Sequence, residues 1–132
     1  MISHAAGSAY DSTATPVTGV AVDYPAGHVI PPHSHPRSQL VYAIEGVLAV
    51  ETAAGRWVLP PTRAVWLQAG VEHTIRARGA VRMRSLFVNV DAIEGLPGSD
   101  CVIDVPPLLR ELILAATLVP PDYPADSRDG RL

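Results

Sequence analysis

The chain has 132 residues, of which 48% are hydrophobic and 17% are charged, and this length allows one packed domain but is short for two. A formal net charge of −3 excludes a general attraction for phosphate backbones, so contact with DNA would have to come from another part of the protein. No apolar run is long enough to cross a bilayer, the first ten residues lack the features of a signal peptide, and the single Cys101 cannot form an internal disulfide. We therefore expect a cytoplasmic protein.

Proline and glycine separate short runs of alternating or continuous apolar residues, which is the pattern of a small all-β barrel or sandwich. The expected strands cover residues 17–24, 39–44, 47–52, 56–59, 64–67, 73–78 and 81–90. Turns are expected at Glu45-Gly46, at 53–55 and at 68–70, Pro60-Pro61 interrupts the pairing, and Gly79 separates the last two expected strands. The middle of the chain is thus predicted to form a meander.

The strand expected at 73–78 alternates strictly between apolar and polar residues, so His73, Ile75 and Ala77 share one face. His73 is therefore predicted to point inward with the apolar set. In the strand that follows, Arg82 and Arg84 are expected on the solvent side.

Residues 107–119 are predicted to form one helix, because apolar residues recur there at three- and four-residue steps. Prolines are tolerated in its first turn, and Pro120-Pro121 ends it. The expected apolar stripe comprises Leu108, Leu109, Leu112, Ala115, Ala116 and Val119. The remaining face still carries Leu114 and Leu118, so the helix is expected either to contact a second copy or a missing neighbour, or to be covered by its own sheet.

We expect residues 1–98 to form the barrel and residues 99–132 to supply the helix and a tail. The tail, "DYPADSRDGRL", is polar and rich in turn-forming residues, as linkers are. The chain is therefore expected to be a fragment of a longer protein.

Histidines form the most informative cluster of the sequence. His33, His35 and Gln39 are evenly spaced, so an extended segment would place all three side chains on one face. His73 can meet them from a neighbouring strand. Neutral imidazole is a common ligand of first-row metals, although a His-x-His pair alone is a weak signal.

The wider spacing strengthens the signal. It runs Gly27, five residues, His33-Ser34-His35, three residues, Gln39, six residues, Gly46, and later Gly70, two residues, His73. Over roughly residues 17–90, this spacing is similar to the two sequence motifs of the cupin family. The resemblance implies an all-β, cupin-type double-stranded β-helix (jelly-roll barrel) with a C-terminal α-helix.

The same resemblance implies that His33, His35, Gln39 and His73 occupy the metal positions of the family. Gln39 stands where cupins usually carry glutamate, Gln68 where proline is usual, and Ala77 where asparagine is usual. A glutamine carbonyl brings a dipole instead of a negative charge, so metal affinity is expected to fall and a bound divalent ion to keep its 2+ charge. Two readings stay open: zinc or nickel, which suit nitrogen donors better than iron does here, or imidazoles that hydrogen-bond one another, water or a ligand.

A narrower resemblance appears when the helix and tail are included. "GRWVLPPTRAVWLQAGVEHTIRARGAVRMRSLFV", followed by "VPPLLRELILAATLVPPDYPADSRDGRL", is similar to the amino-terminal part of AraC-type transcription regulators. This implies a domain that binds a small-molecule effector and mediates dimerisation, here through the helix at 107–119, with DNA read by helix-turn-helix motifs in a downstream domain. Tyr42, Trp57 and Trp66 are candidate effector-binding aromatic residues, although a residue of this kind is more often part of the core.

An enzyme is the competing class, namely a metal-dependent cupin dioxygenase or isomerase. It would need an open coordination position and an acid or base near the metal. Glu45 and Glu72 are the nearest carboxylates in sequence, and both are expected to be solvated in turns. A stand-alone binding cupin is a third class, and it differs from the regulator in lacking a downstream DNA-binding segment. We therefore expect no catalytic residue.

Overall fold

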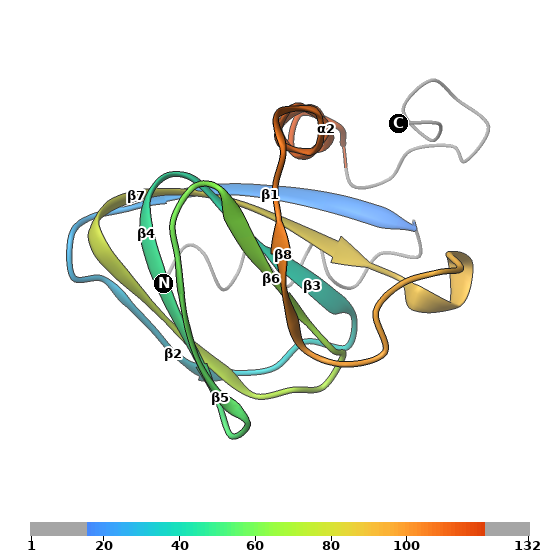
Figure 1. Ribbon diagram of the computed structural model, residues 1–132, viewed down its shortest axis with the longest axis horizontal. Coiled ribbons are helices and arrows are strands. Elements are labelled where there is room, and N and C mark those ends of the chain that lie inside the picture. The colour runs from blue at the N-terminus through green and yellow to red at the C-terminus, as the bar shows by residue number, and fades with distance from the viewer. Residues whose placement is uncertain (1–15, 121–132) are drawn as a thin grey trace.

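The computed structural model describes residues 16–120 (Figure 1). This part of the chain contains eight strands and two helices. The strands are β1 (Val17–Tyr24), β2 (Val29–His33), β3 (Ser38–Val41), β4 (Ala43–Thr52), β5 (Gly55–Leu59), β6 (Arg63–Leu67), β7 (His73–Val88) and β8 (Cys101–Asp104). The helices are the 3-10 turn η1 (Val90–Ala92) and the α-helix α2 (Pro107–Ala116). They form a nearly closed β-barrel with one helix on its outside, which confirms the predicted fold class.

The long strand β7 holds the barrel together. Its first part pairs with β2, its second part pairs with β1 and β3, and β4 pairs with both parts. The predicted division into two strands at Gly79 is wrong, because one strand continues through it with Gly79 in the left-handed region at φ +75°. A glycine accepts this conformation at little steric cost, so β7 can serve both sides of the barrel without a loop.

The predicted turn at Glu45-Gly46 is also wrong. The chain breaks earlier, at Tyr42 between β3 and β4, and β4 then runs through Gly46 to Thr52. The register against β7 shifts around Glu45 and Val47, and Gly46 has φ +84° within this bulge. A side chain at Gly46 would collide with the carbonyl oxygen of Ala80. The glycine therefore allows β4 to approach β7 closely at this point.

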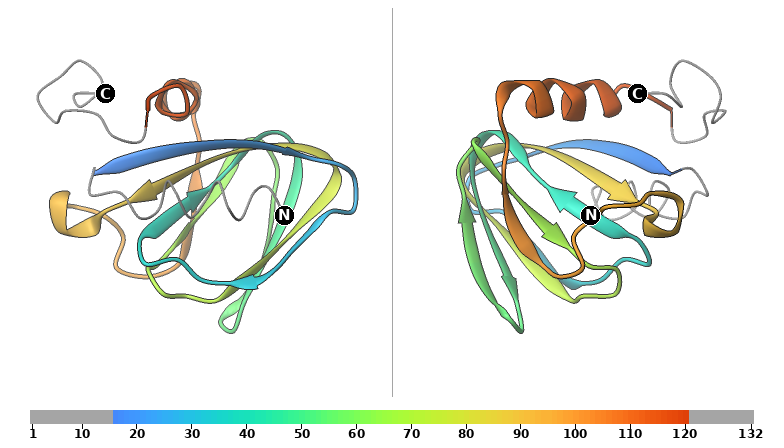
Figure 2. Two further views of the ribbon diagram at one scale, coloured as in Figure 1. Left: turned by 180° about the vertical axis from the view of Figure 1, so that it is seen from behind. Right: turned by 45° about the vertical axis from the view of Figure 1, so that its right-hand side comes forward.

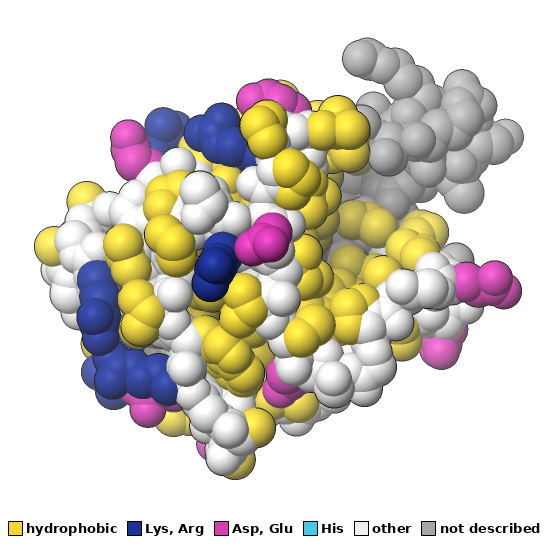
Figure 3. Space-filling model, viewed as in Figure 1, with side chains coloured by type: hydrophobic (Ala, Val, Ile, Leu, Met, Phe, Trp, Pro, Cys, Tyr) yellow, Lys and Arg dark blue, Asp and Glu magenta, His cyan; other side chains and the backbone are white. Residues whose placement is uncertain are grey.

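Helix α2 lies across the outside of the barrel, over β1 and β7 (Figure 2). It ends at Ala116, three residues before the predicted end, where the Thr117 hydroxyl donates to the Leu114 carbonyl. The predicted core-facing stripe is only partly right, because Ile113 is the residue that α2 buries. Leu108 and Leu112 are 73% and 42% exposed, and Figure 3 shows hydrophobic side chains gathered over α2 and β8.

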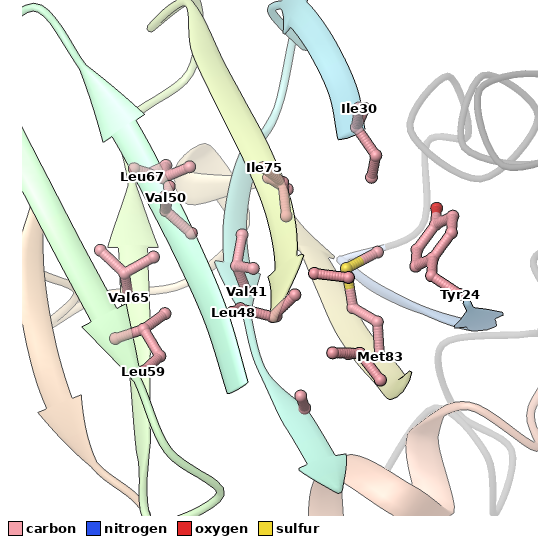
Figure 4. Packing of buried hydrophobic residues seen from close by; sticks show 13 residues of the cluster. Tyr24, Ile30, Val41, Leu48, Val50, Leu59, Val65, Leu67, Ile75 and Met83 are labelled. Carbon is pink, nitrogen blue, oxygen red and sulfur yellow. The ribbon is translucent and has the colours of Figure 1, made fainter. Parts of the chain in front are cut away.

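Alternation along the strands sorts the apolar residues into two clusters. Inward residues such as Val41, Val65 and Leu67 fill the barrel, where Figure 4 shows them beside Ile75 and Met83. Their outward neighbours form a second cluster with β8 and α2. It contains Leu40, Tyr42, Ala64, Trp66, Val88, Val105 and Ile113. Two hydrophobic layers thus lie on the two sides of the same strands.

Two features of the fold depart from the sequence-based expectations. Arg84 is buried instead of solvated, because its guanidinium donates to Asp23 Oδ1 and to the Met83 carbonyl, both within 2.8 Å. Strands β2 and β8 were not predicted, and β2 contains the pair Pro31-Pro32, which is uncommon within a strand. No helix within residues 16–120 has the length and apolarity needed to cross a membrane.

Candidate metal and effector site

Three histidines meet where β2 ends and β7 begins. His33 is the last residue of β2 and pairs directly with His73, the first residue of β7. His35 lies in the connection to β3, where its carbonyl oxygen accepts the Gly70 N–H at 2.8 Å. The loop that precedes β7 therefore fixes the backbone of His35 beside His73.

The three side chains are close enough to share one ion. Their ligand nitrogens lie within 4.8 Å of one another. The ring centroids are 4.3 Å apart for His33 and His73, 4.7 Å for His33 and His35, and 5.5 Å for His35 and His73. The convergence expected from the sequence is present, although the segment between His33 and Gln39 bends instead of continuing as one strand.

Backbone carbonyls orient two of the imidazoles. His33 Nδ1 lies 2.8 Å from the Pro31 carbonyl oxygen, and His73 Nδ1 lies 2.9 Å from the Val71 carbonyl oxygen. A carbonyl only accepts, so each Nδ1 carries the proton and donates it. Nε2 is then left with its lone pair, which is the arrangement that metal-binding histidines adopt.

Burial keeps His73 neutral. The residue is 3% exposed, and burial lowers its pKa from 6.5 to about 4, an effect that the nearby His33 and His35 reinforce. His73 therefore presents an unprotonated nitrogen at neutral pH. Metal ligation requires this state.

Gln39 faces the same interior space. Its side chain is 4% exposed, and within residues 16–120 its Oε1 has no hydrogen-bond partner. His73 Nε2 is likewise buried without a partner in that range. Buried polar atoms of this kind are costly unless something satisfies them. The lone pairs of His73 and Gln39 therefore fit a bound cation or a hydrogen-bond donor.

A small cavity lies beside these groups, inside the barrel. It offers about 30 Å³ of room for the centres of water molecules, which is enough for one or two waters. Within the described part of the chain, no carboxylate lines it. Its lining residues are Val20, Val22, Tyr24, Ile30, His33, His35, Gln39, Ile75, Met83, Ser85 and Phe87.

The donor set fits a metal ion. His33, His35 and His73 would hold it, and Gln39 lies on the wall of the neighbouring cavity with His33 and His35. When bound, such an ion would act as a Lewis acid toward an oxygen or nitrogen atom of a ligand.

The three aromatic residues proposed from the sequence lie elsewhere. Tyr42 and Trp66 belong to the outer cluster, where the Tyr42 hydroxyl donates to Pro61 and the Trp66 indole donates to Gln68. Trp57 packs half-buried against the barrel core and does not line the cavity within the described residues. Contact of these three with an effector remains an untested prediction.

Sequence reasoning missed the polar and aromatic residues on the cavity wall. Ser85 is 1% exposed, and its hydroxyl lacks a partner among residues 16–120. Tyr24 and Phe87 line the cavity, and the Phe87 ring packs edge-on against His35 at 4.8 Å. Ser85 and Phe87 share the inward parity of residues 81–90, so alternation along that strand was the signal that could have found them.

The two carboxylates named from the sequence lie outside the cavity. Glu45 is exposed on β4, and Glu72 is exposed beside His73 in a separate polar recess that Glu51 also lines. Neither carboxylate is therefore among the described residues that line the cavity.

The described strands form a nearly closed β-barrel that carries a histidine cluster. The family model for the Cupin domain matches residues 20–89, and the chain belongs to this family. Among curated proteins, the HTH-type transcriptional regulator NimR of Escherichia coli (strain K12) is 34% identical over 84 residues. That match covers 64% of this chain and 30% of the regulator, so the chain spans less than a third of its relative's length.

Solved structures show the same fold. KdgF from Halomonas sp. is 24% identical with a TM-score of 0.53, and the match covers 62% of this chain and 80% of KdgF. Oxalate decarboxylase from Bacillus subtilis, an enzyme with Mn(II) centres, is 17% identical with a TM-score of 0.51. That match covers 58% of this chain and 22% of the enzyme.

Proposed function

We propose that this chain is the effector-sensing and dimerisation part of an AraC-type transcription regulator. The observation that carries the proposal is the 34% identity to a helix-turn-helix regulator, joined to a barrel that holds a buried histidine cluster. DNA would be read by a separate domain that follows the barrel, in keeping with the net charge of −3.

The effector would bind in the cavity beside His33, His35, Gln39 and His73, with a Zn²⁺ or Ni²⁺ ion held by these residues. A ligand shifts an equilibrium only by its difference in affinity for two arrangements of the protein. The effector would therefore have to favour one arrangement of the barrel and helix over another.

Hydrogen bonds connect this site to the outer layer of the barrel. Gly70 donates its N–H to the His35 carbonyl, and in the same loop Gln68 donates its N–H to Asp100, next to β8. Gln68 also accepts the indole N–H of Trp66, a member of the outer cluster on which α2 packs. These contacts support a route by which a change at His35 can alter the position of β8 and α2.

The segment 107–119 would form the dimer contact. Leu108 and Leu112 lie one helical turn apart on α2 and are 73% and 42% exposed, and Leu118 just beyond the helix is 85% exposed. A symmetric dimer would bury the same patch on both copies.

Two measurements test the proposal: metal uptake by the purified chain, and the coding sequence that follows Leu132. Purified chain depleted with a chelator should take up one equivalent of Zn²⁺ or Ni²⁺ with a rise in melting temperature, and His33→Ala/His73→Ala should abolish both effects. The coding sequence after Leu132 should encode a pair of helix-turn-helix motifs. A reading frame without them contradicts the regulator assignment, and absence of metal uptake contradicts the metal site.

A metal-dependent enzyme is the second candidate, favoured by the histidine cluster and by structural neighbours such as oxalate decarboxylase. Measuring oxygen uptake by the iron-loaded protein, with thiols or flavonols as substrates, distinguishes the enzyme from the effector-sensing regulator. Turnover that is lost in His33→Ala would replace the sensor proposal with an oxygenase.

A further inference from the structure

The charge of the proposed metal site indicates what kind of ligand it takes. Its four protein donors are neutral, because Gln39 offers an amide carbonyl and metal-bound imidazoles are neutral. A divalent ion held there keeps its full 2+ charge within a largely apolar cavity. An uncompensated positive charge in an apolar environment is unfavourable, so we expect the bound ion to attract an anion from solution.

Among the described residues, the wall of the cavity itself supplies no such anion. Glu51 and Glu72 line a separate polar recess, of which His73 also forms part. Glu51 is also paired there with Arg76 at 3.5 Å, with both side chains about half exposed. Neither carboxylate is among the described residues that line the cavity.

Ser85 adds a second recognition element on the same cavity wall. It points inward from β7, two residues before Phe87, whose ring contacts His35. Its hydroxyl is buried without a partner in the range 16–120 and can donate to an acceptor atom. A hydroxyl that donates to an anionic oxygen makes a stronger bond than one that donates to a neutral atom.

We propose that the effector is a small organic carboxylate, with the bound ion and the Ser85 hydroxyl recognising its negatively charged oxygens. This rests on the metal site of the proposed function. A carboxylate carries one charge and two acceptor oxygens, which match one cation and one O–H donor. The remaining wall, formed by Val20, Val22 and Met83 among others, is apolar, and the cavity of about 30 Å³ allows only a short carbon chain.

Isothermal titration of the Zn²⁺- or Ni²⁺-loaded chain with acetate and propionate tests this, with acetamide as the uncharged isostere. Both carboxylates should bind at least about tenfold more tightly than acetamide, and hexanoate should bind more weakly than acetate. Ser85→Ala should weaken acetate binding by about tenfold or more, with unchanged affinity for the metal, because a hydrogen bond to a charged group is lost. Ser34→Ala, which removes an exposed serine between the two histidines, is the matched control.

Gln39→Glu tests the charge argument separately. The new carboxylate should tighten metal binding and weaken acetate binding, because it supplies the missing negative charge from within the protein. Equal affinity for acetate and acetamide, or a Ser85→Ala variant that behaves like Ser34→Ala, overturns this inference and leaves the metal site standing. Failure of the wild-type chain to take up metal contradicts both.

Discussion

Burial of His73 makes the stability of the metal-free chain depend on pH. The folded state holds the pKa of His73 near 4, whereas the unfolded chain restores it to about 6.5. Between pH 6.5 and pH 4, His73 therefore binds a proton in the unfolded state but stays neutral in the folded state. Stability should decrease from pH 6.5 to pH 4 and show no further contribution from this group below pH 4.

The full effect corresponds to roughly 3 kcal/mol, at about 1.4 kcal/mol per pKa unit. Urea denaturation of chelator-treated protein between pH 4 and 7 measures it. His73→Gln removes the titrating group and should flatten the slope, while His28→Gln should leave most of it. Equal slopes in the wild type and in His73→Gln would show that His73 does not titrate in this way.

The side-chain parity of a strand explains which site residues the sequence reveals. His73 begins an alternating run, so its inward direction could be read directly. The even spacing of His33, His35 and Gln39 predicted that they converge, but the chain bends between His33 and Gln39, so the parity of a single strand is not what brings them together. The alternation of side chains along a strand does not show whether a buried polar side chain finds a hydrogen-bond partner. The unpartnered hydroxyl of Ser85 depends on what faces it from the other strands, which a single sequence does not encode locally.

At the scale of the elements, Gly19 determines how closely α2 approaches β1. A Cβ added to Gly19 would lie 2.6 Å from the backbone carbonyl carbon and oxygen of Ala116. These are backbone atoms that cannot rotate away, so either the helix shifts or the contact is strained. Gly19→Ala should therefore destabilise the fold by about 1–3 kcal/mol, the usual range for overpacking.

Urea denaturation at neutral pH measures this cost. Gly55→Ala is the matched control, since it also lies in a strand and a Cβ there would meet no atom within 4 Å. Near-wild-type stability of Gly19→Ala would mean that α2 is not held tightly against β1.

Strand bounds were predictable where a run of apolar residues ends at a turn, as for β1 and β6. They were not predictable where glycine sits inside a strand. Gly46 and Gly79 look like turn residues in the sequence, yet both have positive φ within continuous strands. A glycine in a bulge and a glycine in a hairpin have the same local sequence signal, and long-range pairing with β7 decides between them.

At the scale of the whole molecule, the strands of the barrel separate an inner layer of side chains from an outer one. The histidines and the cavity face inward, whereas the outer cluster supports α2, and the loop 68–70 contacts both. The sequence correctly predicted a C-terminal helix, but its predicted apolar stripe is only partly right, because Ile113 is the residue that α2 buries. Hydrophobic periodicity could not say which apolar residues face the barrel, because α2 carries more of them than one face can bury.

That surplus leads to a prediction about assembly. Leu108 and Leu112 together form an exposed stripe on α2. Replacing both with glutamate should weaken self-association by at least about tenfold. Apolar burial is lost, and like charges then face each other across a symmetric contact. Sedimentation over a dilution series measures the dimer constant. Val58→Glu is the control, since Val58 is 49% exposed on β5, away from α2. A wild-type chain that sediments as a monomer at every concentration, or a loss of dimer in Val58→Glu as large as in the α2 variant, contradicts a dimer through this helix.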